Sequence, residues 1–224
     1  GLGSSDALAA AVFTDGTGTN ATVAGVNNNA AGENANAVGY DNHAVSDNSN
    51  ALGAENQALA EDSNAVGNRN NTNAGNSSAI GIANVTNGIG SNAIGRENTA
   101  NGLNSNAFGI YNSTTGENAN AFGAFNNASG DYASAVGYQN KAYGHLSSAV
   151  GAMTTASGDY ASAMGYGNIA TGYVSSAFGS MNASSGSYAS TFGYQNTASG
   201  NQATALGAQS EATEDFANAF GAGN

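Results

Sequence analysis

Small, polar and bulky apolar residues alternate along this chain in a pattern that recurs at every fourteenth position. The unit reads small–polar–Ala–bulky–Gly, as in NSNALGAEN from Asn48 to Asn56, and its Gly recurs from Gly25 to Gly221 without insertion or deletion. A period kept this strictly predicts one structural unit stacked on itself, with each copy contacting mainly its neighbours. Residues 25–224 are therefore interpreted as one elongated body of about fourteen repeats.

Each unit divides into two halves of seven residues, and each half holds a short alternating segment next to Gly or Asn. Such segments are typical of short strands joined by tight turns, and no apolar pattern at i, i+3 and i+4 indicates a helix. The sequence predicts an all-β fold: a β-solenoid, here a parallel β-roll, with two short strands in every 14-residue coil.

Side-chain parity predicts which residues face the inside of this roll. Ser49, Ala51 and Gly53 share one side of their strand, and Leu52 points to the other side. Two sheets that meet through Ala, Ser and Gly would make a narrow roll with the bulky residues outside. The opposite arrangement, with the bulky residues inside, would give a core of only one large residue per coil. The bulky column consists of Val38, Leu52, Val66, Ile80, Ile94, Phe108, Phe122, Val136, Val150, Met164, Phe178, Phe192, Leu206 and Phe220.

An outward column of this length exceeds the apolar patches that soluble monomers usually expose. A symmetric partner is the simplest cover, and a side-by-side homotrimer is the expected assembly. The bulky column is therefore the candidate intersubunit surface.

Asn precedes the second half of most units. It tolerates the left-handed backbone conformation and bonds turn backbone, so these residues are interpreted as turn residues. Stacked copies would also form an amide ladder. The column contains Asn28, Asn42, Asn56, Asn70, Asn84, Asn98, Asn112, Asn126, Asn140, Asn168, Asn182 and Asn196, with Thr154 and Ser210 as substitutes.

Residues 1–24 do not follow the repeat and form a separate N-terminal segment. The run from Ala7 to Phe13 (ALAAAVF) is compact and apolar. It is expected to cap the first coil, since an uncovered solenoid end exposes unpaired backbone groups. The alternative is a segment that docks on another subunit.

Charge changes the picture of the partners. Charged residues make up only 8% of the chain, against roughly 25% in an average globular protein, and the formal net charge is −12. Arg69, Arg96 and Lys141 are the only basic residues, which argues against a nucleic-acid partner. The acidic, Asn-rich composition fits an extracellular medium, and no apolar run of membrane-spanning length is present.

No group of residues resembles an active site, so the chain is expected to be non-catalytic and to need no cofactor. His43 and His145 stand apart and are interpreted as solvated turn residues. Asp47, Glu61 and Asp62 would stack on neighbouring coils and offer oxygen ligands to calcium, although a solvated acidic edge is the simpler interpretation.

Tyrosines recur at twice the basic period, in every second unit, in the second half of the chain. Tyr combines a rigid ring with a polar tip and is enriched where partners dock. These residues are the candidate ligand surface, and the alternative is that they cover a groove between subunits. The set comprises Tyr132, Tyr138, Tyr160, Tyr166, Tyr188 and Tyr194.

The repeat resembles the N-S-x-A-bulky-G-x-x-S/N motif of YadA-like head domains in trimeric autotransporter adhesins. NSNALGAEN at Asn48, NSSAIGIAN at Asn76 and NSNAFGIYN at Asn104 carry the resemblance, which extends over residues 25–224. It implies a left-handed parallel β-roll, a side-by-side homotrimer and a place on the bacterial surface. Anchoring to an outer membrane would depend on parts outside this sequence, and no ligand residues are transferred.

Two functional hypotheses from different classes remain. The first is an extracellular adhesion module, a trimeric head that attaches to host matrix, cells or other surfaces through a protein or glycan ligand. The second is a structural subunit of an extracellular filament, which would polymerise through its solenoid ends or its N-terminal segment.

Overall fold

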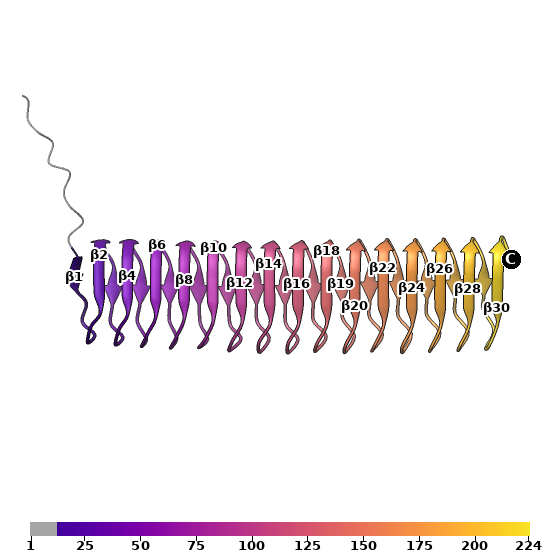
Figure 1. The fold of residues 1–224 in the computed structure, drawn as a ribbon, viewed down its shortest axis with the longest axis horizontal. Coiled ribbons are helices and arrows are strands. Elements are labelled where there is room, and N and C mark those ends of the chain that lie inside the picture. Colours follow the sequence, from indigo (N-terminus) through magenta and orange to yellow (C-terminus); the bar gives the residue numbers. More distant parts are fainter. Residues whose placement is uncertain (1–12) are drawn as a thin grey trace, which may run out of the picture.

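The computed structural model describes residues 13–224, which form one rod of stacked coils with the C-terminus at the far end (Figure 1). Every regular element in this range is a strand, so the predicted all-β parallel solenoid is confirmed. Within the same range, no helix has the length and hydropathy needed to cross a membrane.

Each coil contributes one long strand of five residues and one short strand of two. The long strands are β2 (Thr22–Val26), β4 (Asn36–Tyr40), β6 (Asn50–Ala54), β8 (Asn64–Asn68), β10 (Ser78–Ile82), β12 (Asn92–Arg96), β14 (Asn106–Ile110), β16 (Asn120–Ala124), β18 (Ser134–Tyr138), β20 (Ser148–Ala152), β22 (Ser162–Tyr166), β24 (Ser176–Ser180), β26 (Ser190–Tyr194), β28 (Thr204–Ala208) and β30 (Asn218–Ala222). The short strands are β3 (Asn29–Ala30), β5 (His43–Ala44), β7 (Gln57–Ala58), β9 (Asn71–Thr72), β11 (Val85–Thr86), β13 (Thr99–Ala100), β15 (Ser113–Thr114), β17 (Asn127–Ala128), β19 (Lys141–Ala142), β21 (Thr155–Ala156), β23 (Ile169–Ala170), β25 (Ala183–Ser184), β27 (Thr197–Ala198) and β29 (Glu211–Ala212).

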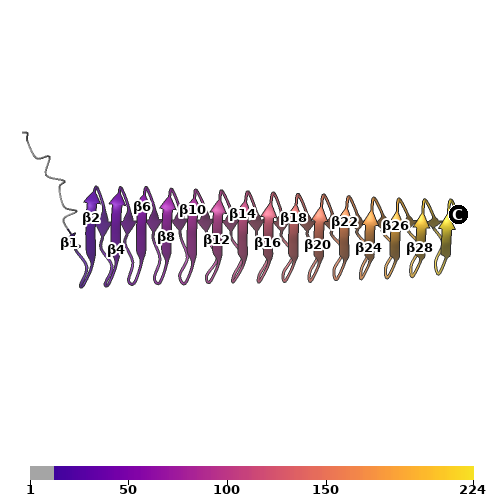
Figure 2. The same cartoon turned by 45° about the horizontal axis from the view of Figure 1, so that its top comes forward.

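The two kinds of strand form two layers (Figure 2). The long strands and β1 (Phe13–Asp15) build a 16-stranded sheet, and the short strands build a 14-stranded sheet. Pairing between coils is parallel and in register, for example Ile80 opposite Ile94 and Gly81 opposite Gly95. Equivalent residues of the repeat therefore lie in columns along the rod.

The interior of the roll is built from alanine. Every buried apolar residue among those described is Ala, and Ala44 and Ala51 have no exposed surface. The largest fully buried side chains are asparagines together with Thr72. Small side chains fill the space between the two sheets and the bulky column lies on the outer face, so the arrangement with the bulky column inside is wrong.

Each coil turns at two residues with positive φ, seven positions apart. Glu55 has φ 56° and Asp62 has φ 56°, and both positions recur along the rod. The predicted left-handed role of the Asn column is wrong: the positive φ belongs to the residue before each of them, as in Asp41 before Asn42. Each of these asparagines instead turns its side chain inward, where the amide bonds backbone that the turn leaves unpaired.

The glycine of the repeat is required by close packing between coils. Gly137 has φ 119°, and a Cβ at this position would lie 2.0 Å from the carbonyl oxygen of Gly151 in the next coil. Any side chain would therefore separate the two coils and break the ladder of the long sheet.

The N-terminal edge of the long sheet is covered by β1, which pairs antiparallel with β2. The predicted boundary between residues 24 and 25 falls inside β2. The first coil escapes the repeat motif because Ala24 occupies the place of the bulky residue. The predicted cap at Ala7–Phe13 lies outside the described residues except for Phe13.

Candidate interaction surfaces on the long sheet

The bulky column lies on the outer face of the long sheet. Its fourteen members are all half-buried or exposed, from Val38 at one end to Phe220 at the other. Register pairing stacks them directly, and the rings of Phe108 and Phe122 lie 5.1 Å apart at 20°. Phe178 and Phe192 repeat this stack at 5.2 Å. The outward direction predicted from parity is confirmed, whereas contact with a neighbouring subunit stays a prediction.

A polar column flanks one side of the bulky column. Its members are the first residues of the long strands, and the Asn36 Nδ2 donates to Asn50 Oδ1 at 2.8 Å. Asn50 bonds Asn64 in the same way at 2.9 Å. These ladders hold the amides parallel to the rod and place a hydrogen-bonding stripe beside the apolar one.

The opposite flank carries the last residues of the long strands. Several are large and exposed, including Tyr40, Ile82, Ile110 and Tyr138. The outer face of the long sheet therefore presents a polar stripe, the bulky column and a second, interrupted apolar stripe.

The six candidate tyrosines do not form one surface. Tyr138, Tyr166 and Tyr194 are the last residues of their long strands and lie along the side of the sheet where these strands end. Tyr132, Tyr160 and Tyr188 precede their long strands and lie in the turns on the side where these strands begin. A five-residue strand separates the two sets by more than about 13 Å, so the predicted single surface resolves into two rows.

The turn row is longer than the sequence prediction because two further rings join it. Tyr132, His145, Tyr160, Tyr173 and Tyr188 form a continuous series of edge-to-face contacts, here named the aromatic row. Its ring centroids lie 5.5–5.9 Å apart, with interplanar angles of 78–84°. Edge-to-face geometry within this distance is favourable for aromatic pairs.

Sequence reasoning missed His145 and Tyr173 because they depart from the regular spacing of the repeat. His145 stands thirteen positions after Tyr132, and Tyr160 stands fifteen positions after His145. Rings alternate between two adjacent turn positions, with Leu146 and Val174 taking the left-handed position in the intervening coils. An alternation of thirteen and fifteen among aromatic residues is the signal that would have found them.

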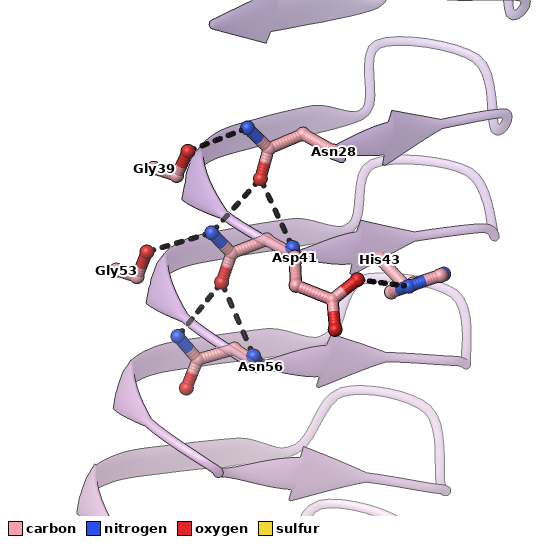
Figure 3. Close-up of polar contacts among 7 residues, drawn as sticks. Asn28, Gly39, Asp41, His43, Gly53 and Asn56 are labelled. Atoms are coloured by element: carbon pink, nitrogen blue, oxygen red, sulfur yellow. Dashed lines mark hydrogen bonds and ion pairs between the residues drawn. The ribbon is translucent and has the colours of Figure 1, made fainter. Parts of the chain in front are cut away.

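The Asn column forms the predicted amide ladder inside the roll (Figure 3). Asn42 Nδ2 and its backbone N–H both donate to Asn28 Oδ1, at 3.0 and 2.9 Å. The same Nδ2 donates to the carbonyls of Val38 and Gly53. Each amide therefore satisfies the turn of its own coil and links it to both neighbours.

This ladder is interrupted once between its first and last members. Thr154 closes only half of the link: its N–H and Oγ1 donate to Asn140 Oδ1 at 3.0 and 2.7 Å. The Asn168 amide still bonds the carbonyls of Met164 and Gly179. No described hydrogen bond joins the side chains of Thr154 and Asn168.

A shallow polar groove lies at the turn between the long and short strands of the first coils. His43 Nε2 lies 3.4 Å from Asp41 Oδ1, and Arg69 Nε donates to Glu55 Oε2 at 2.7 Å. That hydrogen bond raises the pKa of Arg69 above its usual value. These contacts are solvent-exposed and worth little to stability, and they arrange no nucleophile beside a base.

Two of the three predicted calcium ligands, Asp47 and Asp62, accept hydrogen bonds from neighbouring coils. Asp47 Oδ1 accepts the backbone N–H of Glu33 at 2.8 Å, and Asp62 Oδ1 accepts Asn48 Nδ2 at 3.0 Å. Across residues 13–224, no three His, Cys, Asp or Glu side chains gather as a metal site. Calcium binding stays an untested prediction.

Comparison with known families gives one match. The YadA head domain repeat, described as two copies, matches residues 17–42, 115–140, 142–168, 184–210 and 198–224. These segments together cover more than half of the chain, and no curated protein matches it. Members of this family are adhesin-type, cell-surface proteins that self-associate, and their β-solenoid fold is typically non-catalytic. The 14-residue coil, the outward bulky column and the family match agree, and the chain belongs to the YadA head domain repeat family.

Proposed function

We propose that this chain is a non-catalytic adhesion module that acts as a side-by-side homotrimer on the outside of the cell. The observation that carries the proposal is the bulky column, which stays half-buried or exposed along the whole long sheet. An apolar stripe of this length is costly in water, and identical chains arranged about a three-fold axis cover it symmetrically. The short sheet and the turns then remain free for a protein or glycan ligand.

A measurement of mass in solution tests the assembly. The purified chain of 21.8 kDa is expected to elute at three times this mass in size-exclusion chromatography with light scattering. A double change of Phe178→Asp and Phe192→Asp, which breaks one stack of the column, is expected to give monomers.

The matched control places the same two charges on the other sheet. Ile169 and Ala183 lie side by side on adjacent short strands. Ile169 is exposed and Ala183 is half-buried. Ile169→Asp with Ala183→Asp is expected to keep the trimer. A wild-type chain that stays monomeric at micromolar concentration would refute the proposed assembly.

Electron microscopy of the same sample separates the adhesion module from a filament subunit. Discrete short rods are expected, with attachment of rod-coated beads to matrix-coated surfaces as the functional readout. Continuous threads that grow with concentration would favour end-to-end addition of coils, because open sheet edges pair with further strands.

A further inference from the structure

The aromatic row is exposed on the single chain and lies outside the Ala core of the roll. Tyr132, Tyr160, Tyr173 and Tyr188 are each about half-exposed, and they lie in the turn at one edge of the long sheet. The Ala core beneath this turn is complete without them. In an edge-to-face series, the planes of alternate rings run parallel to the row. The two faces of each such ring are therefore turned away from its neighbours in the row.

Carboxylates line the same turn. Asp131 precedes Tyr132, and Asp159 precedes Tyr160, and both acids are exposed. One oxygen of each accepts a backbone N–H of the preceding coil, from Glu117 at 2.9 Å and from His145 at 2.9 Å. These bonds fix both carboxylates two coils apart, about 10 Å along the row at the usual strand spacing.

Among the described residues, no Lys or Arg side chain forms an ion pair with these two carboxylates. The sequence holds three basic residues, and Arg69 and Arg96 belong to earlier coils. Lys141 lies on the short strand β19, in the other sheet. A ring face attracts cations through its quadrupole, and adjacent carboxylates add a charge of the matching sign.

One place in this molecule already shows how such a group is held. The Arg96 guanidinium lies 5.9 Å from the centre of the Tyr111 ring, and its Nε lies 3.1 Å from Glu97 Oε1. The side-chain hydrogen bond from Tyr111 to Glu97 raises the pKa of the tyrosine. An exposed ring beside a carboxylate therefore holds a guanidinium on this scaffold.

We propose that the aromatic row, with Asp131 and Asp159, binds an extended segment of another protein that is rich in arginine or lysine. The segment would run along the rod, with its cationic side chains over the ring faces and its charges next to the two carboxylates. This partner class deepens the proposed adhesion function and rests on that function only for its biological meaning. An anionic glycan would meet repulsion from the same carboxylates.

Calorimetric titration of the full chain with an oligo-arginine peptide tests the proposal. Asp159→Asn keeps the oxygen that accepts the His145 N–H and removes the charge, and it is expected to weaken binding about two- to fivefold. Tyr160→Leu with Tyr173→Leu keeps apolar bulk without ring faces and is expected to weaken binding about fivefold or more. Binding should also fall as salt is added.

Two controls match these changes. Asp47 makes the same bond to the coil before it, in a turn without rings, so Asp47→Asn is expected to leave the affinity unchanged. Tyr166 is exposed in the same coil as Tyr160 but ends the long strand, so Tyr166→Leu is expected to leave it unchanged as well. Circular dichroism melting shows whether each variant stays folded.

Three outcomes would overturn the proposal. Equal weakening by Asp47→Asn and Asp159→Asn would mean that only the net charge attracts the peptide. Equal affinity for a neutral Gly/Ser peptide would rule out a cationic ligand. A folded wild-type chain that does not bind oligo-arginine would also refute the proposal. Light scattering reports the assembly separately, so a monomer that binds the peptide refutes the trimer and leaves this inference standing.

Discussion

At the scale of single residues, the buried asparagine is what makes so thin a roll workable. A turn between two short strands leaves carbonyls that face inward, such as those of Phe122 and Gly137. Asn126 Nδ2 donates to both, and its Oδ1 accepts the backbone N–H and the Nδ2 of Asn140. A buried polar group without a partner costs about 1–3 kcal/mol, and one amide here satisfies several.

Two substitutions in this ladder should change stability in opposite directions. Asn126→Ala leaves the carbonyls and the Asn140 N–H unpaired, and it should lower the free energy of unfolding by about 2 kcal/mol or more. Thr154→Asn restores the missing link between Asn140 and Asn168 and should raise the melting temperature. Thermal and denaturant unfolding followed by circular dichroism measures both.

The neighbouring residue supplies the control. Asn127 on short strand β17 is half-buried, and its Oδ1 is buried without a hydrogen-bond partner, so Asn127→Ser removes no hydrogen bond to that oxygen and should not lower the stability. If Asn126→Ala and Asn127→Ser had the same melting temperature, the ladder would contribute nothing particular to stability.

At the scale of the strand, adjacent residues point to opposite faces, so one is buried and the next lies on the outer face. In β18, Ala135 has no exposed surface and faces the Ala column of the short sheet, whereas Val136 is half-buried on the outer face. In most coils the two sheets are held apart by Ala methyl groups, and a few coils carry Thr or Ser at the same positions. The roll therefore tolerates size on one side of a strand and almost none on the other.

The same substitution at these two positions tests this view. Ala135→Leu should destabilise the chain by about 3 kcal/mol or more, because overpacking forces the sheets apart. Val136→Leu should change stability by less than about 0.5 kcal/mol, and other members of its column are already Leu. Comparable melting points for the two variants would mean that the core is not as narrow as its alanines indicate.

At the scale of the whole molecule, the rod is a sum of nearest-neighbour contacts. Apart from β2, which also pairs with β1, long strands pair only with the long strands of adjacent coils, and short strands pair only with short strands. Stability of such an array is approximately additive in its repeats. Insertion or deletion of one whole 14-residue repeat should therefore change the length of the rod and little else.

Removal of one full coil checks this additivity. Deletion of residues 113–126 joins Asn112 to Asn127 and should leave a folded, shorter rod with a cooperative transition. Deletion of 113–119 removes half a coil and sets long-strand sequences against short ones, so it should unfold or aggregate. Equal circular dichroism spectra and melting curves for the two deletions would contradict the coil as the structural unit.

Much of this architecture was readable from the chain. The spacing of the repeat set the coil and its two strands, and parity placed Leu52 outside and Ala51 inside, because strand side chains alternate whatever their neighbours are. The amide ladder also followed, since equivalent residues of a stacked repeat must lie above one another. Only the tertiary structure decided which turn residue takes positive φ, as at Asp41 rather than Asn42. It also separated Tyr132 from Tyr138 and joined His145 and Tyr173 to the aromatic row. These outcomes depend on the direction in which each turn aims its side chains, and a period along the sequence carries no information about that direction.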